Sequence, residues 1–210
     1  MSAIASPYGF KPVNLIGGLP YAGSTRNVPI ASGYGTNIFT GSLVAINASG
    51  VLVIATSTGA DATTNGFPTG TANTGCLGVF VGCSYTNPST KQKVFSQYWP
   101  TGTVASDAVG IVVDDDRCVF QVQAAGTVAA TDLGANFFLS AVQSTSTGST
   151  TTGNSTTSVV AGASAVTTTA AFRCVGFVDM VGFSTVGDAY TDILVKFNPG
   201  YHSYTNAVGL

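Results

Sequence analysis

The stretch Cys76–Pro100, CLGVFVGCSYTNPSTKQKVFSQYWP, indicates the fold of this chain. Its first eight residues are apolar on both alternating faces, which is typical of a strand covered on both sides. Gly78 and Gly82 permit a close backbone approach or a bulge in that strand. A polar segment follows and leads into a second run that ends in Tyr98 and Trp99. We therefore expect a central strand and a β-hairpin with an exposed tip.

Further runs of strand length lie on both sides of this stretch. SLVAINASGVLVIA, residues 42–55, predicts two strands around an Asn47–Gly50 turn. AVGIVVDDDRCVFQVQ, residues 108–123, predicts two strands around a hairpin turn at Asp114, Asp115, Asp116 and Arg117. FRCVGFVDM (172–180) and DAYTDILVKFNP (188–199) predict the last strands, and the second alternates buried and exposed positions.

The composition agrees with an all-β fold. All nine acidic residues are aspartates, lysine is scarce, and Thr, Val, Gly and Ser are abundant, so amphipathic helices have little material. TDLGANFFLSAV, residues 131–142, is the one good helix candidate, and Gly134 limits it to one or two turns. We expect an antiparallel sandwich or barrel-like domain with at most one or two short helices.

The chain divides into three expected parts. Residues 1–36 are rich in Gly, Pro, Ser and Asn and predict an extended N-terminal arm. Residues 37–200 form the β-rich domain, with an exposed, mobile Ser/Thr/Gly-rich loop at 143–158. Residues 201–210 form a C-terminal tail that leaves the sheet.

The charge and hydropathy of the chain limit the kinds of partner that it is expected to bind. Only 8% of residues are charged, so we expect much of the surface to be covered by neighbours in an assembly. The net charge is −2 and no basic run exceeds Lys91-Gln92-Lys93, which argues against direct nucleic-acid binding. No apolar run reaches the roughly 18 residues of a membrane span, and the N-terminus lacks a secretory signal pattern. We expect synthesis in a cytoplasm and no membrane partner.

Nothing in the sequence predicts an enzyme, a cofactor or a metal. The chain has no dinucleotide, P-loop or zinc-protease motif, and its one histidine, His202, stands in the tail. The Asp114–Asp116 triplet suits a turn, with a single bound Ca²⁺ as the alternative. The four cysteines have no CxxC spacing and read as buried free thiols, with Cys76 and Cys83 on opposite faces of their strand.

Aromatic side chains are the candidate binding residues. Tyr85, Phe95, Tyr98 and Trp99 suit core packing, a protein interface or stacking on a sugar, and the residues alone leave all three readings open.

Several segments, taken in order, resemble the small head proteins of tailed bacteriophages known as capsid decoration or cement proteins. The resemblance is carried by SPYGFKPV, GVFVGCSYTNPSTKQKVFSQYWPTGT, AVGIVVDDDRCVFQVQAAG, TDLGANFFL and DAYTDILVKFNPGYHS. It implies a β-rich protein, often a trimer, that binds the outside of an icosahedral shell and ties major capsid protein subunits together. Under this reading, Tyr8 and Phe10 of the arm and Tyr98 and Trp99 of the hairpin tip supply the contacts.

Two other functions compete with capsid decoration. One is a carbohydrate-binding or adhesive β-module that uses the patch around Trp99 and the 143–158 loop. The other is a phage tail or fibre subunit, which would share the β-rich, charge-poor composition.

Overall fold

The structure, a computed structural model, is nearly all-β and describes residues 4–55, 75–141, 143, 145–160, 170–180 and 183–205. Within these residues the only helical element is a 3-10 turn, η1 (Ala130–Asp132), and no helix is long and apolar enough to cross a membrane. The strands are β1 (Lys11–Leu15), β2 (Arg26–Pro29), β3 (Ile38–Phe39), β4 (Leu43–Ile46), β5 (Leu52–Ile54), β6 (Gly78–Thr86), β7 (Lys93–Ser96), β8 (Tyr98–Trp99), β9 (Val109–Val113), β10 (Cys118–Ala125), β11 (Asn136–Phe137), β12 (Val159–Val160), β13 (Phe172–Phe177) and β14 (Asp192–Phe197).

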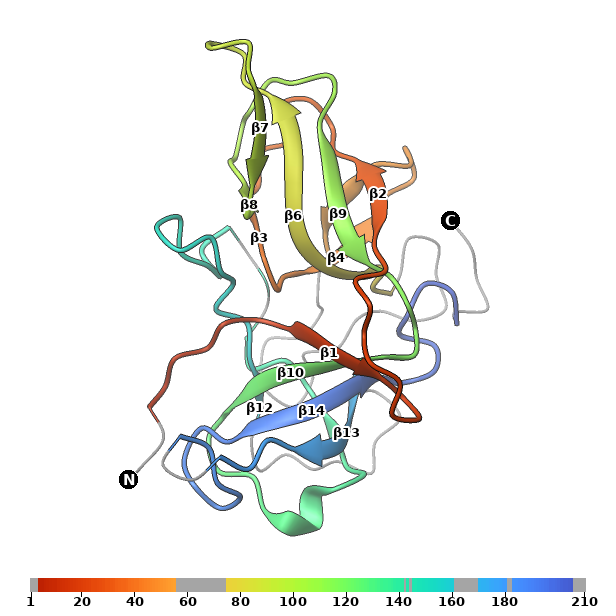
Figure 1. Cartoon of the computed structure of the whole chain (residues 1–210), viewed down its shortest axis with the longest axis vertical. Coiled ribbons are helices and arrows are strands. Elements are labelled where there is room, and N and C mark those ends of the chain that lie inside the picture. Colours follow the sequence, from red (N-terminus) through yellow and green to blue (C-terminus); the bar gives the residue numbers. More distant parts are fainter. Residues whose placement is uncertain are drawn as a thin grey trace.

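The strands form two main sheets, one above the other in Figure 1. The upper sheet has the order β2-β9-β6-β4-β5, with β7 paired to β6 and the short β3-β8 pair beside it. A bridge between Ile30 and Leu52 joins its first and last strands, which gives the upper sheet a barrel-like form. The lower sheet has the order β1-β10-β14-β13-β11, with β12 paired to β10. The predicted all-β, antiparallel fold is confirmed.

The central strand predicted from CLGVFVGC is β6, which pairs with β9, β4 and β7. Its Gly78 permits the close approach of β9, since a Cβ placed there would lie 2.0 Å from the Val113 carbonyl oxygen. A bulge between Phe80 and Gly82 shifts the register with β9.

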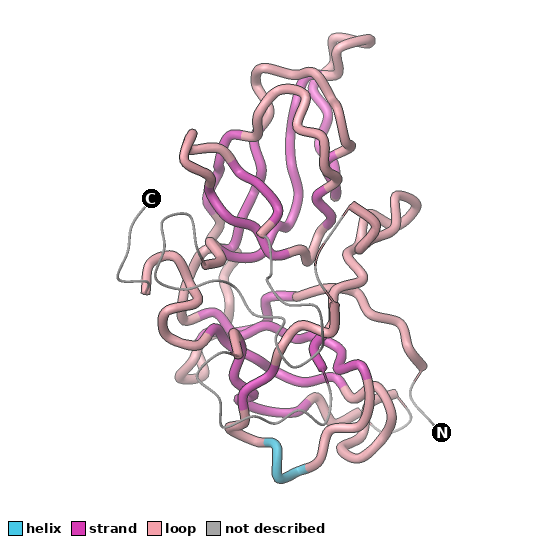
Figure 2. Tube along the Cα trace, turned by 180° about the vertical axis from the view of Figure 1, so that it is seen from behind, coloured by secondary structure: helices cyan, strands magenta, loops and turns pink. Residues whose placement is uncertain are grey.

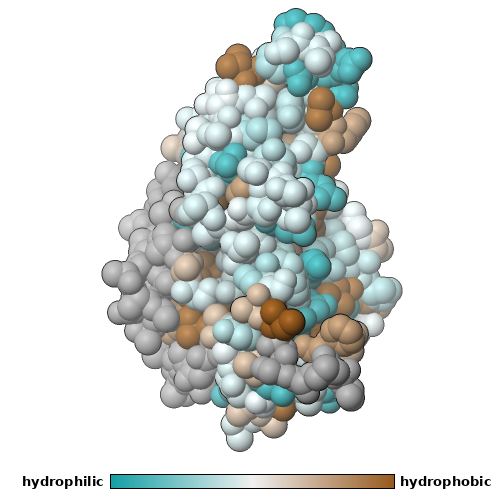
Figure 3. Space-filling model, turned by 90° about the vertical axis from the view of Figure 1, so that its left-hand side faces the viewer, coloured by the Kyte–Doolittle hydropathy of each residue, from teal (hydrophilic) through white to brown (hydrophobic). Residues whose placement is uncertain are grey.

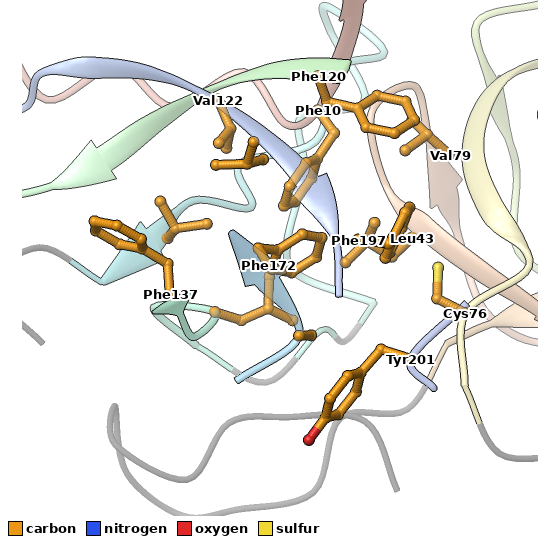
Figure 4. Close-up of a cluster of buried hydrophobic side chains, with 14 of the residues drawn as sticks. Phe10, Leu43, Cys76, Val79, Phe120, Val122, Phe137, Phe172, Phe197 and Tyr201 are labelled. Atoms are coloured by element: carbon orange, nitrogen blue, oxygen red, sulfur yellow. The ribbon is translucent and has the colours of Figure 1, made fainter. Parts of the chain in front are cut away.

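Two hydrophobic cores hold the molecule together. The first lies between the lower sheet and the base of the upper sheet and contains Phe10, Cys76 and Phe172 (Figure 4). The second lies inside the upper sheet and contains Phe80, Cys83 and Trp99. Cys76 precedes β6 and enters the first core, whereas Cys83 lies on β6 and enters the second, so the two thiols are separated although they do not share one regular strand as predicted.

The predicted N-terminal arm is part of the two sheets over residues 11–29 rather than a separate segment. β1 pairs with β10 and β2 pairs with β9, so this segment contributes a strand to each sheet. Just before β1, the Phe10 amide donates to the Gly41 carbonyl at 3.0 Å, and the Phe10 side chain is buried in the first core. The sequence does not predict these strands, because they are short and pair with segments about 80 to 110 residues away.

The predicted hairpin at Asp114–Arg117 is also wrong. β9 and β10 are strands, as expected, but β9 belongs to the upper sheet and β10 to the lower. The segment between them is a crossover from one sheet to the other. Alternation alone cannot separate these cases, because both need two strands joined by a polar turn.

The Ser/Thr/Gly-rich segment at 143–158 is partly buried rather than a wholly exposed loop; its residue 144 lies outside the described residues. The Gln143 side chain, itself buried, accepts from the Leu43 amide and donates to the carbonyls of Leu43 and Ala55. Ser155 is fully buried, and its amide donates to the Thr40 carbonyl. Small polar residues can pack here because the body of the protein satisfies their hydrogen bonds.

The helix candidate at 131–142 and the C-terminal tail also differ from expectation. The first forms only η1 and then β11, which pairs with β13. The tail leaves β14 but returns to the body, where a bridge joins Cys76 to His202. Residues 206–210 lie outside the described residues.

Candidate interaction surface

The hairpin tip expected around Trp99 is instead the short β3–β8 pair beside the upper sheet, and Trp99 on β8 is buried there. Trp99 has no solvent exposure, its indole Nε1 donates to the Tyr34 carbonyl at 3.3 Å, and Tyr85 packs against it edge to face. Tyr85 is also buried. Trp99 and Tyr85 therefore stabilise the second core and are not available as contacts in the isolated chain, which corrects their prediction as interface residues.

Tyr98 and Phe10 also pack within the protein. Tyr98 is half-buried and stacks on Phe39 at 5.6 Å between ring centroids. Phe10 stacks on Phe172 at 4.8 Å and meets Phe120 edge to face (Figure 4). Burial of Phe10 is the clearest difference from the expected arm contact.

Tyr8 is half-buried near the lower sheet, and the Lys11 ammonium lies 4.1 Å from the centre of its ring. Burial raises the pKa of the Tyr8 hydroxyl, and the negative charge of Asp192 raises it further. The phenol therefore stays neutral. Nearby, the Gln123 side chain accepts from the Ser6 amide and donates to the Ile4 carbonyl, which fixes residues 4–8 against the sheet.

Of the six predicted aromatic residues, Phe95 alone has an exposed side chain, at 78%. It lies on β7, whose Val94 packs against the second core, so Phe95 points to the outer face of the upper sheet. Figure 1 shows β7, β6, β9 and β2 side by side in this sheet.

Charged and polar groups accompany Phe95 on β7, on the neighbouring β6 and in the loop before β9. Asp107 accepts hydrogen bonds from the Lys93 ammonium at 2.9 Å and from the Thr86 amide and hydroxyl. The hydrogen bond from Lys93 and those from Thr86 hold the pKa of the Asp107 carboxyl well below its usual range. These groups satisfy one another on the surface.

The structure shows a second exposed apolar feature, which is not among the residues predicted from the sequence. Val13, Ile16 and Leu19 are 43%, 44% and 61% exposed, and together they form what we call the β1 turn patch. The turn is ordered by hydrogen bonds from Leu15 to Leu19 and from Gly18 to Leu15. Gly17 and Gly18 both adopt positive φ angles, which favour glycine. The signal was the motif NLIGGLP, an apolar run broken only by a glycine pair.

The exposed apolar residues form patches on a weakly charged surface. On the face shown in Figure 3, apolar side chains appear as separate brown areas among mostly pale ones. Besides Phe95 and the β1 turn patch, the large exposed apolar residues of the described part are Ile4, Val104, Leu133, Met180, Phe183 and Tyr204.

His202 is buried at the junction of the two sheets and does not face solvent. Its Nδ1 accepts from the Tyr204 amide at 3.3 Å, and its ring packs edge to face on Phe197. Burial lowers the pKa of His202 below its ordinary value, against the opposing effects of Asp116, Asp114 and Asp115 and of the Leu77 backbone. The imidazole is therefore neutral and structural in this geometry.

Two aspartates of the triplet beside His202, Asp114 and Asp115, already have partners. The Asp114 carboxylate pairs with Arg26 Nε at 2.8 Å and accepts from the Tyr204 hydroxyl at 2.9 Å. Asp115 accepts from the Arg117 amide, and the Arg117 guanidinium lies 3.7 Å from it. No group of three or more metal-ligating side chains gathers among the described residues, so the calcium alternative has no cluster there.

All four cysteines are free and buried, as predicted. Burial raises the pKa of the Cys76, Cys83 and Cys118 thiols to about 12, so each stays protonated. Although Cys76 bridges to His202 through the backbone, its Sγ donates to the carbonyls of Val44 and Gly78. This arrangement does not make a thiolate–imidazole pair.

The comparisons with known proteins add no relative. No protein family model matches the chain, and no curated protein or solved structure matches it either.

Proposed function

We propose that this chain is a capsid decoration protein that binds the outside of a tailed-phage head and stabilises contacts of the major capsid protein. The observation that carries the proposal is the β1 turn patch, in which three apolar side chains are exposed within seven residues. The chain has only 8% charged residues, so little of its surface discourages association. Contiguous exposed apolar patches are typical of surfaces that contact another molecule, protein partners included.

The proposed role needs many modest contacts rather than one strong site. A shell repeats the same binding site by symmetry, and a trimer that touches several subunits gains affinity through effective concentration. A rigid chain suits this role, because two cores and two hydrogen-bonded sheets fix the position of the exposed turn. The resemblance of the sequence to head decoration proteins supports the same proposal.

Co-sedimentation with capsids tests the proposal. Purified protein is added to expanded capsids assembled without it, and the pelleted particles are analysed for bound protein and for melting temperature. We expect saturable binding and a higher capsid melting temperature. Absence of co-sedimentation at high protein concentration would overturn the proposal.

A variant of the β1 turn patch tests its contribution directly. Ile16→Ser with Leu19→Ser should weaken capsid binding while the chain keeps its own stability, because both side chains are exposed. Val104→Ser, at an exposed apolar side chain away from β1, is the matched control and should bind as the wild type does. Equal capsid binding by the wild type, the double variant and Val104→Ser would show that the β1 turn patch is not part of the interface.

The burial of Trp99 weakens the main alternative. A carbohydrate-binding module would have used an exposed tryptophan for stacking on sugar rings, and this chain has no other tryptophan.

A further inference from the structure

Two like charges stand directly opposite each other on the lower sheet. Arg173 on β13 pairs in register with Lys196 on β14. Their strand neighbours Phe172, Cys174, Val195 and Phe197 enter the first core, so both cationic side chains lie on the opposite, outer face. Figure 1 shows β13 and β14 side by side in the lower sheet.

Neither cation is neutralised within the described part of the chain. The three ion pairs there join Arg26 to Asp114, Lys93 to Asp107 and Arg117 to Asp115, and none includes Arg173 or Lys196. Like charges directly opposite each other destabilise an antiparallel pair. In a chain with only seven Lys and Arg, this arrangement costs stability, and no ion pair of the described residues offsets it.

The guanidinium of Arg173 is held in place. Its Nε donates to Asn136 Oδ1 at 3.1 Å, and the same oxygen accepts from Asn198 Nδ2 at 3.0 Å. Asn198 is buried and also donates to the Ala170 carbonyl at 2.8 Å. Through Asn136, the buried Asn198 thus orients the exposed arginine, whose terminal nitrogens match the geometry of a carboxylate.

We propose that Arg173 and Lys196 bind an acidic segment of a partner protein, and, resting on the proposed function, that this segment belongs to the shell subunit. A carboxylate placed between the two side chains would neutralise the like-charge pair and accept hydrogen bonds from both. The cationic pair lies on β13 and β14, and the β1 turn patch lies on and directly after β1, the edge strand of the same sheet.

The charges favour a protein partner over nucleic acid. A protein that binds the phosphate backbone typically neutralises several phosphates with a basic stripe. This chain has a net charge of −2, and its described cations outside this pair are in ion pairs or dispersed. Two opposed cations fit one acidic segment better.

Lys196→Glu separates binding from folding. The new carboxylate would face Arg173 across the strands, so the melting temperature of the variant should equal or exceed that of the wild type. Binding to capsids assembled without this protein should fall by about tenfold or more, because one hydrogen bond to a charged group accounts for roughly that factor. Lys196→Gln, which only removes the charge, should weaken binding less.

The control is Lys91→Glu, the same charge change on an exposed residue of the loop between β6 and β7. It should bind as the wild type does. If Lys196→Glu binds capsids as well as the wild type does, this inference is overturned and the proposed function still stands. The same conclusion follows if Lys91→Glu loses as much capsid binding as Lys196→Glu does. A wild-type chain that does not bind capsids would overturn the proposed function and this inference together.

Discussion

Replacement of Phe10 by alanine should strongly destabilise the chain. Phe10 is 1% exposed, lies in the first core, stacks on Phe172 at 4.8 Å and contacts Phe120 edge to face. Truncation of a buried phenylalanine removes its burial energy and leaves a cavity, at a typical cost of about 3–5 kcal/mol. Gly9 and Gly41 are in close backbone contact beside it, which limits how far the segment can relax into that cavity.

The assay is thermal and denaturant unfolding of the purified chain, followed by circular dichroism. A loss of about 3–5 kcal/mol is a large part of the roughly 5–15 kcal/mol that stabilises a typical domain, and at this chain length each kcal/mol lowers Tm by about 2–4 °C. Phe95→Ala is the matched control, because the same atoms are removed from a side chain that is 78% exposed. The control should change stability by less than about 0.5 kcal/mol. A Phe10→Ala protein as stable as the control would show that the N-terminal segment does not pack as described.

Three further predictions concern the interior. Gly78→Ala should destabilise the chain in urea unfolding, because the new Cβ would lie 2.0 Å from the Val113 carbonyl oxygen; unchanged stability would contradict the close approach of β6 and β9. Burial lowers the pKa of His202 below 6.5, so the imidazole takes up a proton more readily in the unfolded chain than in the folded one. The free energy of unfolding should therefore be unaffected by His202 above about pH 6.5, and it should fall as the pH drops from 6.5 through the pKa of the folded state. His202→Gln should flatten this slope between pH 7 and 5, and an unchanged slope would assign it to other groups. The four buried thiols should resist a thiol reagent at pH 8 in the native protein and all react in denaturant; rapid native reaction would contradict their burial.

The strongest apolar patterns predicted the fold well. CLGVFVGC marked the central strand β6, and the alternation in β14 placed Ile193, Val195 and Phe197 in the core. The Asn47–Gly50 turn joins β4 and β5 as expected, with Gly50 at a positive φ. These features are local, because residues close in sequence determine them.

The incorrect predictions concern features that depend on distant residues. β1 pairs with β10 and β2 with β9, so nothing within either short segment marks it as a strand. Ser155 is buried because its amide reaches Thr40, which low-complexity composition cannot indicate. Trp99 is a candidate contact residue from the sequence because a large amphipathic ring suits an interface as well as a core, and only the packing of Tyr85 and the hydrogen bond to Tyr34 place it in the core.

The candidate contact residues were predicted only in small part. Phe95 is exposed, but the β1 turn patch and the Arg173–Lys196 pair were not recognised. Opposed charges on β13 and β14 become visible only when the register between these strands is known, since the two residues are 23 positions apart.

Cryo-electron microscopy of capsids saturated with this protein tests the central proposal most directly. We expect all-β density at symmetry-related sites on the outer surface, with β1 and the β13–β14 face turned toward the shell. Density confined to the tail, or no added density on the head, would contradict it.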